Sequence, residues 1–268
     1  METSLSSEQI IFYRENGFLV IDPLLSVDEL AVWRTTLDEA INERIIEQQT
    51  HNQDRGDNYY KYVFIQCVNM WKTNPKIRQL ALDPRIGKMA TDLTGTDGIR
   101  LFHDHALIKQ PWANPTNWHL DNPSDPYHTR QSTMFWLVLD DATIQNGCLY
   151  FLPGTHHNSR FEPIGGLGRE GVGQMFQQYP EWKQIDPYVA ETKAGAGIFI
   201  NGMVAHAAGP NMTTRPRRAF AMLLMPEGAI FNGKQSVLPE SYFKSLQIGN
   251  VLENDEHLPL LYSRSVET

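Results

Sequence analysis

The sequence predicts a mainly β protein with flanking α-helices, and two observations support this. From residue 99 onward, short apolar segments alternate with turn-forming pairs such as Asn146-Gly147 and Gly209-Pro210, a spacing typical of a sandwich or barrel. Before residue 95, apolar residues recur at helical spacing behind capping residues. The 268 residues contain no internal repeat, low-complexity segment or obvious linker. We therefore predict a single domain over residues 1–268, with the N-terminal helices packed on one sheet.

The composition excludes several classes of protein. The net charge is −8, and the densest basic run is residues 215–218, so we expect no nucleic-acid partner. No apolar run approaches the roughly 20 residues that span a bilayer, so we expect no membrane partner. The first residues show no signal-peptide pattern, and the two cysteines, Cys67 and Cys148, suit a reducing compartment. These features predict a soluble cytoplasmic protein.

The N-terminal third is predicted to be largely helical. Ser6 begins a first helix that ends near Gly17, and the apolar residues 18–21 follow as a strand. Residues 26–29 form a second capping box. The next helix has one apolar face, formed by Leu30, Trp33, Leu37 and Ile41.

Residues 62–71 are predicted to be a buried strand or core segment because they are rich in aromatic and β-branched side chains. Gln66 is polar among these apolar neighbours, so it needs a hydrogen-bond partner, either backbone or ligand. Two short helices are predicted next, over 75–82 and 84–93, each with proline in its first turn.

The remaining two-thirds supply the predicted strands of the barrel. Residues 158–186 interrupt their rhythm and are predicted to be a mobile insert beside the active site. The strands are expected at residues 99–108, 117–121, 132–139, 148–152, 188–192, 197–200 and 217–225.

The candidate metal site begins with His119 and Asp121. Residues two apart in a strand project from the same face, so an imidazole and a carboxylate can point into one cavity. With His206 they would form the two-histidine, one-carboxylate set used by non-haem Fe(II) oxygenases. The alternatives are two surface residues and a packed core histidine.

A candidate anion site lies eleven residues after His206. Arg217 begins an apolar strand in which Ala219, Ala221 and Leu223 share its face, so small side chains would leave room for a ligand. A guanidinium can hold a carboxylate with two parallel hydrogen bonds. The alternative is a plain surface arginine.

Three motifs together resemble the phytanoyl-CoA dioxygenase family, a branch of the Fe(II)/2-oxoglutarate oxygenases. The motifs are His119-Leu120-Asp121, the segment 146–156 (Asn-Gly-Cys-Leu-Tyr-Phe-Leu-Pro-Gly-Thr-His), and His206 followed by Arg217. The resemblance extends from about residue 8 to residue 226. It implies a double-stranded β-helix, which is a jelly-roll or cupin-like barrel, and it implies Fe(II) and 2-oxoglutarate as cofactors.

The resemblance also assigns site residues. It implies His119, Asp121 and His206 as the iron ligands, and Arg217 as the residue that binds the distal carboxylate of 2-oxoglutarate. Trp136, eleven residues before Gly147, would line the cosubstrate pocket, and Gln66 and Asn117 are candidates for polar contacts there. Core packing is the alternative for Trp136, and a strand-edge position is the alternative for Asn117.

The sequence departs from the family pattern at three positions. Ala208 stands where members often carry serine, Leu120 where they often carry glutamine, and Ala196 where an acidic residue is common. These departures concern secondary contacts to the cosubstrate. The retained Asp121 favours oxygen chemistry, because related halogenases replace this carboxylate with a small residue so that chloride can bind the iron.

We therefore expect an O₂-dependent dioxygenase that hydroxylates an unactivated C–H bond of a small-molecule metabolite, in secondary metabolism. Relatives with an intact triad also desaturate, epoxidise or close rings. The loops 59–71, 112–122 and 165–182 are expected to shape the pocket, and no basic cluster suits the phosphates of coenzyme A. The alternative from another class is a cupin-like metal-dependent isomerase, or a small-molecule binding protein without redox chemistry.

Overall fold

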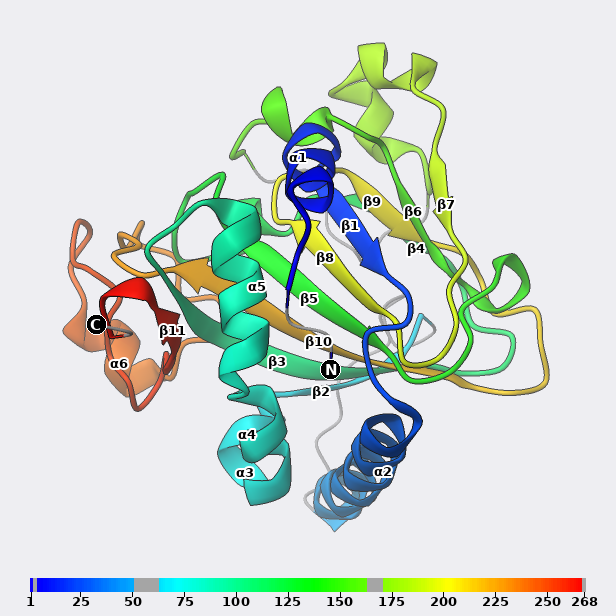
Figure 1. The fold of residues 1–268 in the computed structure, drawn as a ribbon, viewed down its shortest axis with the longest axis horizontal. Helices are drawn as coiled ribbons and strands as arrows, with labels where there is room; N and C mark the ends of the chain where they lie inside the picture. The colour runs from blue at the N-terminus through cyan, green and yellow to red at the C-terminus, as the bar shows by residue number, and fades with distance from the viewer. Residues whose placement is uncertain (2–3, 51–62, 163–170, 267–268) are drawn as a thin grey trace.

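The fold is a pair of antiparallel sheets stacked face to face, seen in a computed structural model that describes residues 1, 4–50, 63–162 and 171–266 (Figure 1). The larger sheet has the strand order β1-β8-β5-β10-β3-β11, with β2 also paired to β3. The smaller sheet has the order β4-β9-β6-β7. The described strands are β1 Phe18–Ile21, β2 Ile65–Val68, β3 Gly98–Lys109, β4 Thr116–His119, β5 Thr133–Val138, β6 Leu149–Phe151, β7 Tyr188–Ala190, β8 Gly197–Asn201, β9 His206–Ala208, β10 Arg217–Pro226 and β11 Leu260–Ser263.

The eight strands from β3 to β10 are shared equally between the two sheets. β3, β5, β8 and β10 lie in the larger sheet, and β4, β6, β7 and β9 lie in the smaller one. A chain that passes back and forth between two facing sheets in this way forms a jelly roll. The predicted fold class is confirmed.

The helices begin and end as the capping residues indicate. Ser6 and Gln9 form a capping box before α1, and Gly17 closes that helix with a left-handed φ of 84°. Gly95 closes α5 in the same way, with φ 71°. The described α-helices are α1 Ser7–Asn16, α2 Val27–Thr50, α3 Met70–Thr73, α4 Pro75–Ala81, α5 Pro84–Thr94 and α6 Glu240–Ser245. None of the helices in the described ranges is both long and apolar enough to cross a membrane.

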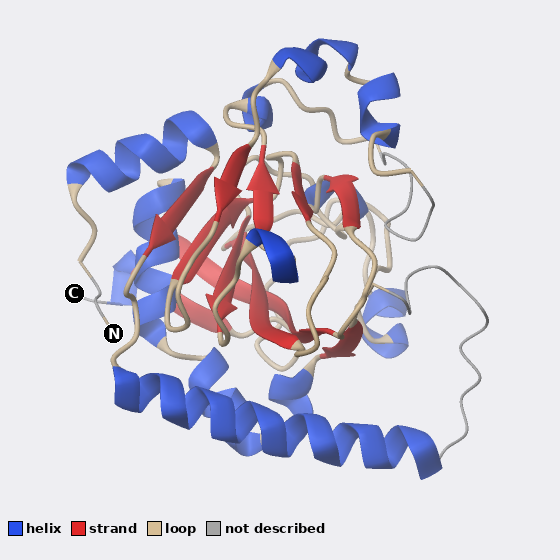
Figure 2. Cartoon of the chain, turned by 90° about the vertical axis from the view of Figure 1, so that its right-hand side faces the viewer, coloured by secondary structure: helices blue, strands red, loops and turns tan. Residues whose placement is uncertain are grey.

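The N-terminal helices cover the outer face of the larger sheet, as predicted (Figure 2). On β10, Phe220 and Met222 point outward into this helical layer, while Ala219 and Ala221 point toward the smaller sheet. Trp33 of α2 packs on Phe220, with ring centroids 5.1 Å apart. The helices thus leave the inner face of the larger sheet to the space between the sheets.

The described residues 63–71 form a short strand over Ile65–Val68 and otherwise contribute buried core side chains, which agrees with the prediction of a strand or core segment, while residue 62 lies outside the described residues. Asn69 has a left-handed backbone with φ 57°, and the short helix α3 follows it. The carboxylate of Asp104 accepts hydrogen bonds from the backbone N–H groups of Met70 and Trp71, at 2.7 and 2.8 Å. This capping interaction turns the chain into a helix despite its β-branched and aromatic composition.

The described part of the predicted insert over 158–186 contributes to a small hydrophobic cluster that it shares with residues of the barrel. Two 3-10 turns, η5 (Gln174–Gln177) and η6 (Pro180–Gln184), lie at the top right of Figure 1. Met175 and Trp182 pack there against Leu120 and Met203. Residues 163–170 of this segment lie outside the described residues. The described turns therefore pack against the segment that follows β4, which contains Leu120.

Candidate active site

A cavity of about 510 Å³ lies between the two sheets. The smaller sheet and the turn that follows β4 contribute His119, Asp121 and His206 to its wall, and the larger sheet contributes Trp136 and Arg217. Five side chains selected from the sequence are thus brought together although they are distant along the chain.

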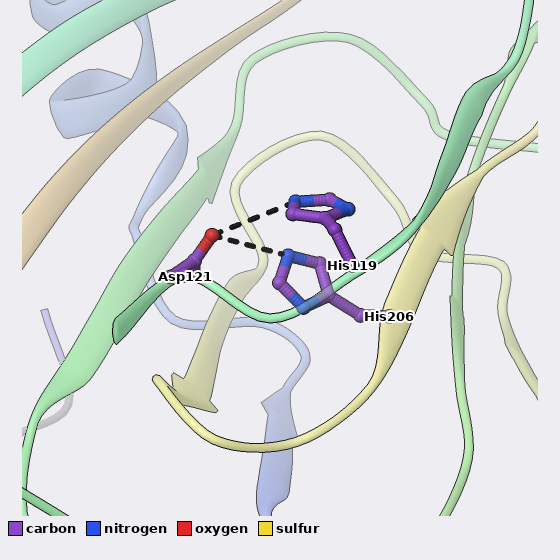
Figure 3. A group of neighbouring side chains, drawn as sticks. All are labelled: His119, Asp121 and His206. Carbon is purple, nitrogen blue, oxygen red and sulfur yellow. Dashed lines mark ion pairs between the residues drawn. The ribbon is translucent and has the colours of Figure 1, made fainter. Parts of the chain in front are cut away.

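The three candidate metal ligands converge at one point (Figure 3). His119 of β4 and His206 of β9 are directly paired across the two strands, and their ring centroids are 4.1 Å apart. The Asp121 Oδ1 atom lies 3.5 Å from His119 Nε2 and 3.7 Å from His206 Nε2. The two imidazoles and the carboxylate therefore face a common centre.

Asp121 reaches this centre by a different route from the predicted one. The prediction placed it on the same strand as His119, but β4 ends at His119, and the backbone of Asp121 is helical, with φ −80° and ψ −53°. The N–H groups of Asp121 and Asn122 both donate to the carbonyl of Gly202, at 3.1 and 2.9 Å. This turn, rather than strand alternation, aims the carboxylate at the histidines.

Backbone carbonyls fix the orientation of both imidazoles. His119 Nδ1 lies 2.8 Å from the carbonyl oxygen of Asn117, and His206 Nδ1 lies 3.1 Å from that of Val204. A carbonyl oxygen only accepts, so Nδ1 carries the proton in each ring and Nε2 keeps its lone pair. Burial, followed by repulsion from His119, lowers the pKa of His206 to about 4, so this imidazole is neutral at pH 7.

The carboxylate has an unused oxygen. Burial alone would raise the pKa of Asp121, but His206 and His119 outweigh it and lower this pKa to about 2. Its Oδ2 is buried and has no hydrogen-bond partner among the described residues. An anionic carboxylate with one oxygen facing two imidazole lone pairs and the other without a partner fits a divalent cation. Two nitrogens and one oxygen form the donor set of a non-haem iron site.

Arg217 is a buried cation at one end of the cavity. Its side chain is 2% exposed, one N–H group donates to the carbonyl of Gly147 at 3.2 Å, and its Nε has no partner among the described residues. The guanidinium carbon lies 5.0 Å from the centre of the Trp136 ring. Burial lowers the pKa of Arg217 to about 10, so it stays charged at pH 7. In the described part of the chain no carboxylate pairs with it, whereas the neighbouring Arg218 pairs with Asp38 and Asp140. An anionic ligand would supply the missing charge.

A second buried cation, Lys109, is the register partner of Arg217 on β3. Its ammonium group donates to the carbonyl of Asn114 at 2.7 Å. Burial and the nearby Arg217 lower the pKa of Lys109 to about 7. This lysine was not among the predicted site residues because it lies one residue beyond the predicted strand 99–108.

The three remaining candidates for contacts to the cosubstrate, Trp136, Gln66 and Asn117, differ in whether they reach the cavity. Trp136 and Gln66 line the cavity, but the side chain of Asn117 does not. Between Thr116 and His119 the ladder slips, so three steps along β4 match two along β9. This bulge brings Thr116 and His119 to the cavity and turns Asn117 away from it. Asn117 contributes its backbone carbonyl to His119 instead.

Several cavity residues were not anticipated. His103 and His105 lie on the inner face of β3, and Asp125 and Ser236 lie near the turn after Asp121 and in the C-terminal segment. Period-2 alternation in the predicted strand 99–108 would have indicated the histidine pair. Of the predicted loops, 63–71 and 112–122 reach the cavity, while the described residues 171–182 do not line it.

Comparisons with known proteins bear on this geometry. A model of the family described as phytanoyl-CoA dioxygenase (PhyH) matches residues 13–219. The chain belongs to this family. A phytanoyl-CoA dioxygenase from Arabidopsis thaliana is 27% identical over 256 residues, covering 82% of this chain and 88% of that protein.

Two solved structures share the fold. One is the non-heme alpha ketoglutarate dependent carbocyclase SnoK from nogalamycin biosynthesis, with a TM-score of 0.76 and 24% identity over 96% of each chain. The other is the epimerase SnoN in complex with Fe³⁺, alpha ketoglutarate and nogalamycin RO, with a TM-score of 0.71 and 23% identity over 95% of this chain and 98% of that chain. The family prediction is confirmed. The predicted cofactors agree with the iron and keto acid bound in the SnoN complex and with the His–Asp–His triad of this chain.

Proposed function

We propose that the protein is an Fe(II)- and 2-oxoglutarate-dependent dioxygenase that hydroxylates an unactivated C–H bond of a small-molecule metabolite. One observation carries this proposal: a His–Asp–His triad and a buried arginine without an acidic partner in the described chain face the same cavity. Membership in a dioxygenase family supports the reaction class. The likeness to two proteins of nogalamycin biosynthesis supports a role in secondary metabolism.

Different residues would bind the two cofactors. His119, Asp121 and His206 would hold Fe(II), and Arg217 would hold the distal carboxylate of 2-oxoglutarate through its two-pronged guanidinium. When bound, the iron and keto acid supply oxidation of a C–H bond by O₂, in which R–H, 2-oxoglutarate and O₂ give R–OH, succinate and CO₂.

The chain itself positions the reactants and excludes water. Trp136 lies over one face of the Arg217 guanidinium and leaves the in-plane N–H groups to bind the carboxylate. Leu107, Leu149 and Ala208 make the wall beyond it apolar. A charge pair formed in such surroundings is stronger than one in water, which favours a single orientation of the keto acid.

Hydroxylation is proposed ahead of the other outcomes seen in the fold. The similar structures belong to a carbocyclase and an epimerase. The presence of Asp121 argues against halogenation, which needs a vacant ligand position. The cupin-like isomerase or binding protein is disfavoured because neither has a need for the buried Arg217.

Replacing Asp121 or His206 with alanine tests the assignment. Each change removes one of three ligand side chains, so we expect succinate formation from 2-oxoglutarate, Fe(II) and air to fall to background. Succinate is measured by NMR without added substrate, as slow uncoupled turnover. His157→Ala, which replaces an exposed histidine, should behave like the unaltered protein. Unchanged succinate formation in either ligand variant would refute the proposal.

A further inference from the structure

The cavity has two chemically different ends. The register of β3 and β10 shows which residues lie at each end. From one end to the other, Arg217 pairs with Lys109, Ala221 with His105, and Leu223 with His103. At about 3.4 Å per residue, His105 lies roughly 13 Å from the cationic end and His103 roughly 20 Å from it. The two histidines therefore mark the end opposite to Arg217.

The metal ligands lie between these two ends. Gly209, which directly follows β9, packs closely on Gly147, whose carbonyl accepts from Arg217. His206 is three residues before Gly209, about 10 Å along the strand direction. A keto acid that joins Arg217 to the triad thus occupies the cationic end. The histidine end is left for the molecule that is oxidised.

Gln66 determines which ring nitrogen of His105 carries the proton. The Gln66 Nε2 atom lies 3.0 Å from His105 Nδ1, and because an amide nitrogen only donates, Nδ1 is the acceptor. The proton of His105 is therefore on Nε2. Since His105 lines the cavity, this N–H is a donor available to a ligand.

The imidazole of His103 has no hydrogen-bond partner for its Nδ1 atom within the described chain. It is 7% exposed, it lines the cavity, and its Nδ1 is buried without a partner among the described residues. Its ring packs edge-on against His105, with centroids 5.4 Å apart. A buried imidazole nitrogen without a partner costs free energy that a bound polar group would recover.

The residues around His103 and His105 indicate which charge a ligand at this end can carry. At this end the described lining contains no lysine or arginine, so a carboxylate or phosphate would have no counter-charge in direct contact. Phe64, Met134 and Val237 supply apolar surface beside the two imidazoles. A hydrogen-bonding pair beside apolar side chains fits an uncharged oxygen on a hydrocarbon body, and the buried carboxyl of Asp125 in the same lining also disfavours an anion.

We propose that His103 and His105 form the substrate-recognition subsite, and that it binds a hydroxyl or carbonyl oxygen of an uncharged, largely apolar molecule. This inference rests on the proposed function, which places the keto acid at the Arg217 end. It predicts that acyl-CoA thioesters and free carboxylic acids are poor substrates.

A matched set of bicyclic compounds tests the proposal. The probes are α-tetralone, α-tetralol, and the carboxylate and ammonium compounds of the same skeleton, titrated by ligand-observed NMR under nitrogen with Fe(II) and 2-oxoglutarate present. We expect the ketone and alcohol to bind about tenfold more tightly than either charged analogue, which corresponds to one well-made hydrogen bond. The variants His103→Leu and His105→Leu should lose this preference. His103→Gln and His105→Gln keep an N–H donor and should retain part of it.

A control variant and a second readout separate the possible failures. His257→Leu replaces a histidine that packs on Tyr242 and does not line the cavity, so it should bind like the unaltered protein. The proposed subsite is contradicted if a charged analogue binds most tightly, if the leucine variants bind the ketone as tightly as the unaltered protein does, or if no probe binds. If Fe(II) and 2-oxoglutarate give no visible absorption band in the unaltered protein, the proposed function fails, while the ketone titration still tests the histidine pair.

Discussion

At the scale of single residues, the site depends on hydrogen bonds that decide which nitrogen carries a proton. Backbone carbonyls hold the proton of His119 and His206 on Nδ1, so both Nε2 lone pairs face Asp121. Gln66 has the opposite effect on His105 and leaves the proton on Nε2. The first arrangement suits a metal and the second suits an acceptor group on a ligand.

Lys109 gives a prediction for pH dependence. Its pKa falls from its ordinary 10.5 to about 7 in the folded protein because the ammonium is buried beside Arg217. The unfolded chain therefore binds more protons than the folded one between these two values, and the free energy of unfolding rises with pH across that window. We expect it to rise by about 2 kcal/mol more between pH 7 and pH 9 than in Lys109→Met. Urea denaturation of both proteins at the two pH values measures the difference, and equal slopes would contradict this account.

At the scale of elements, short interruptions of regular structure place the functional groups. The bulge in β4 brings both Thr116 and His119 to the cavity, and the turn after the strand redirects Asp121. Neither feature follows from the sequence alone, because alternation with period 2 assumes an unbroken strand. The helix boundaries at Ser6 and Gly17 could be predicted, since capping depends on a few neighbouring residues.

The link between β3 and α3 yields a second stability prediction. Asp104 lies on the outer face of β3, opposite the histidine pair, and accepts two backbone N–H groups at the start of α3. Asp104→Ala leaves both buried donors without an acceptor, so we expect a loss of about 2–4 kcal/mol in the free energy of unfolding. Asp104→Asn keeps one acceptor oxygen and should lose less. Denaturant titration compares the three proteins, and a loss under about 0.5 kcal/mol in the alanine variant would contradict the capping role.

At the scale of the whole molecule, the jelly roll brings together groups that are far apart in the sequence. The family motifs predicted the triad, Arg217 and the two-sheet architecture. The far wall of the cavity was harder to predict, because Ser236 and Val237 come from a segment after the last barrel strand. Lys234 and Asn232 join that segment to the loop after Asp121 through backbone carbonyls. Such long-range contacts leave no periodic pattern in the sequence.

The central claim is that one cavity holds Fe(II) on the triad and 2-oxoglutarate on Arg217. An anaerobic titration tests it most directly: Fe(II) is added to the metal-free protein, followed by 2-oxoglutarate, while the visible absorption is recorded. We predict a weak band that needs at least about tenfold more 2-oxoglutarate in Arg217→Leu, since a buried charge pair is lost. Arg215→Leu, which replaces an exposed neighbour, should titrate like the unaltered protein. Metal binding without a band, or an unchanged titration in Arg217→Leu, would contradict the claim.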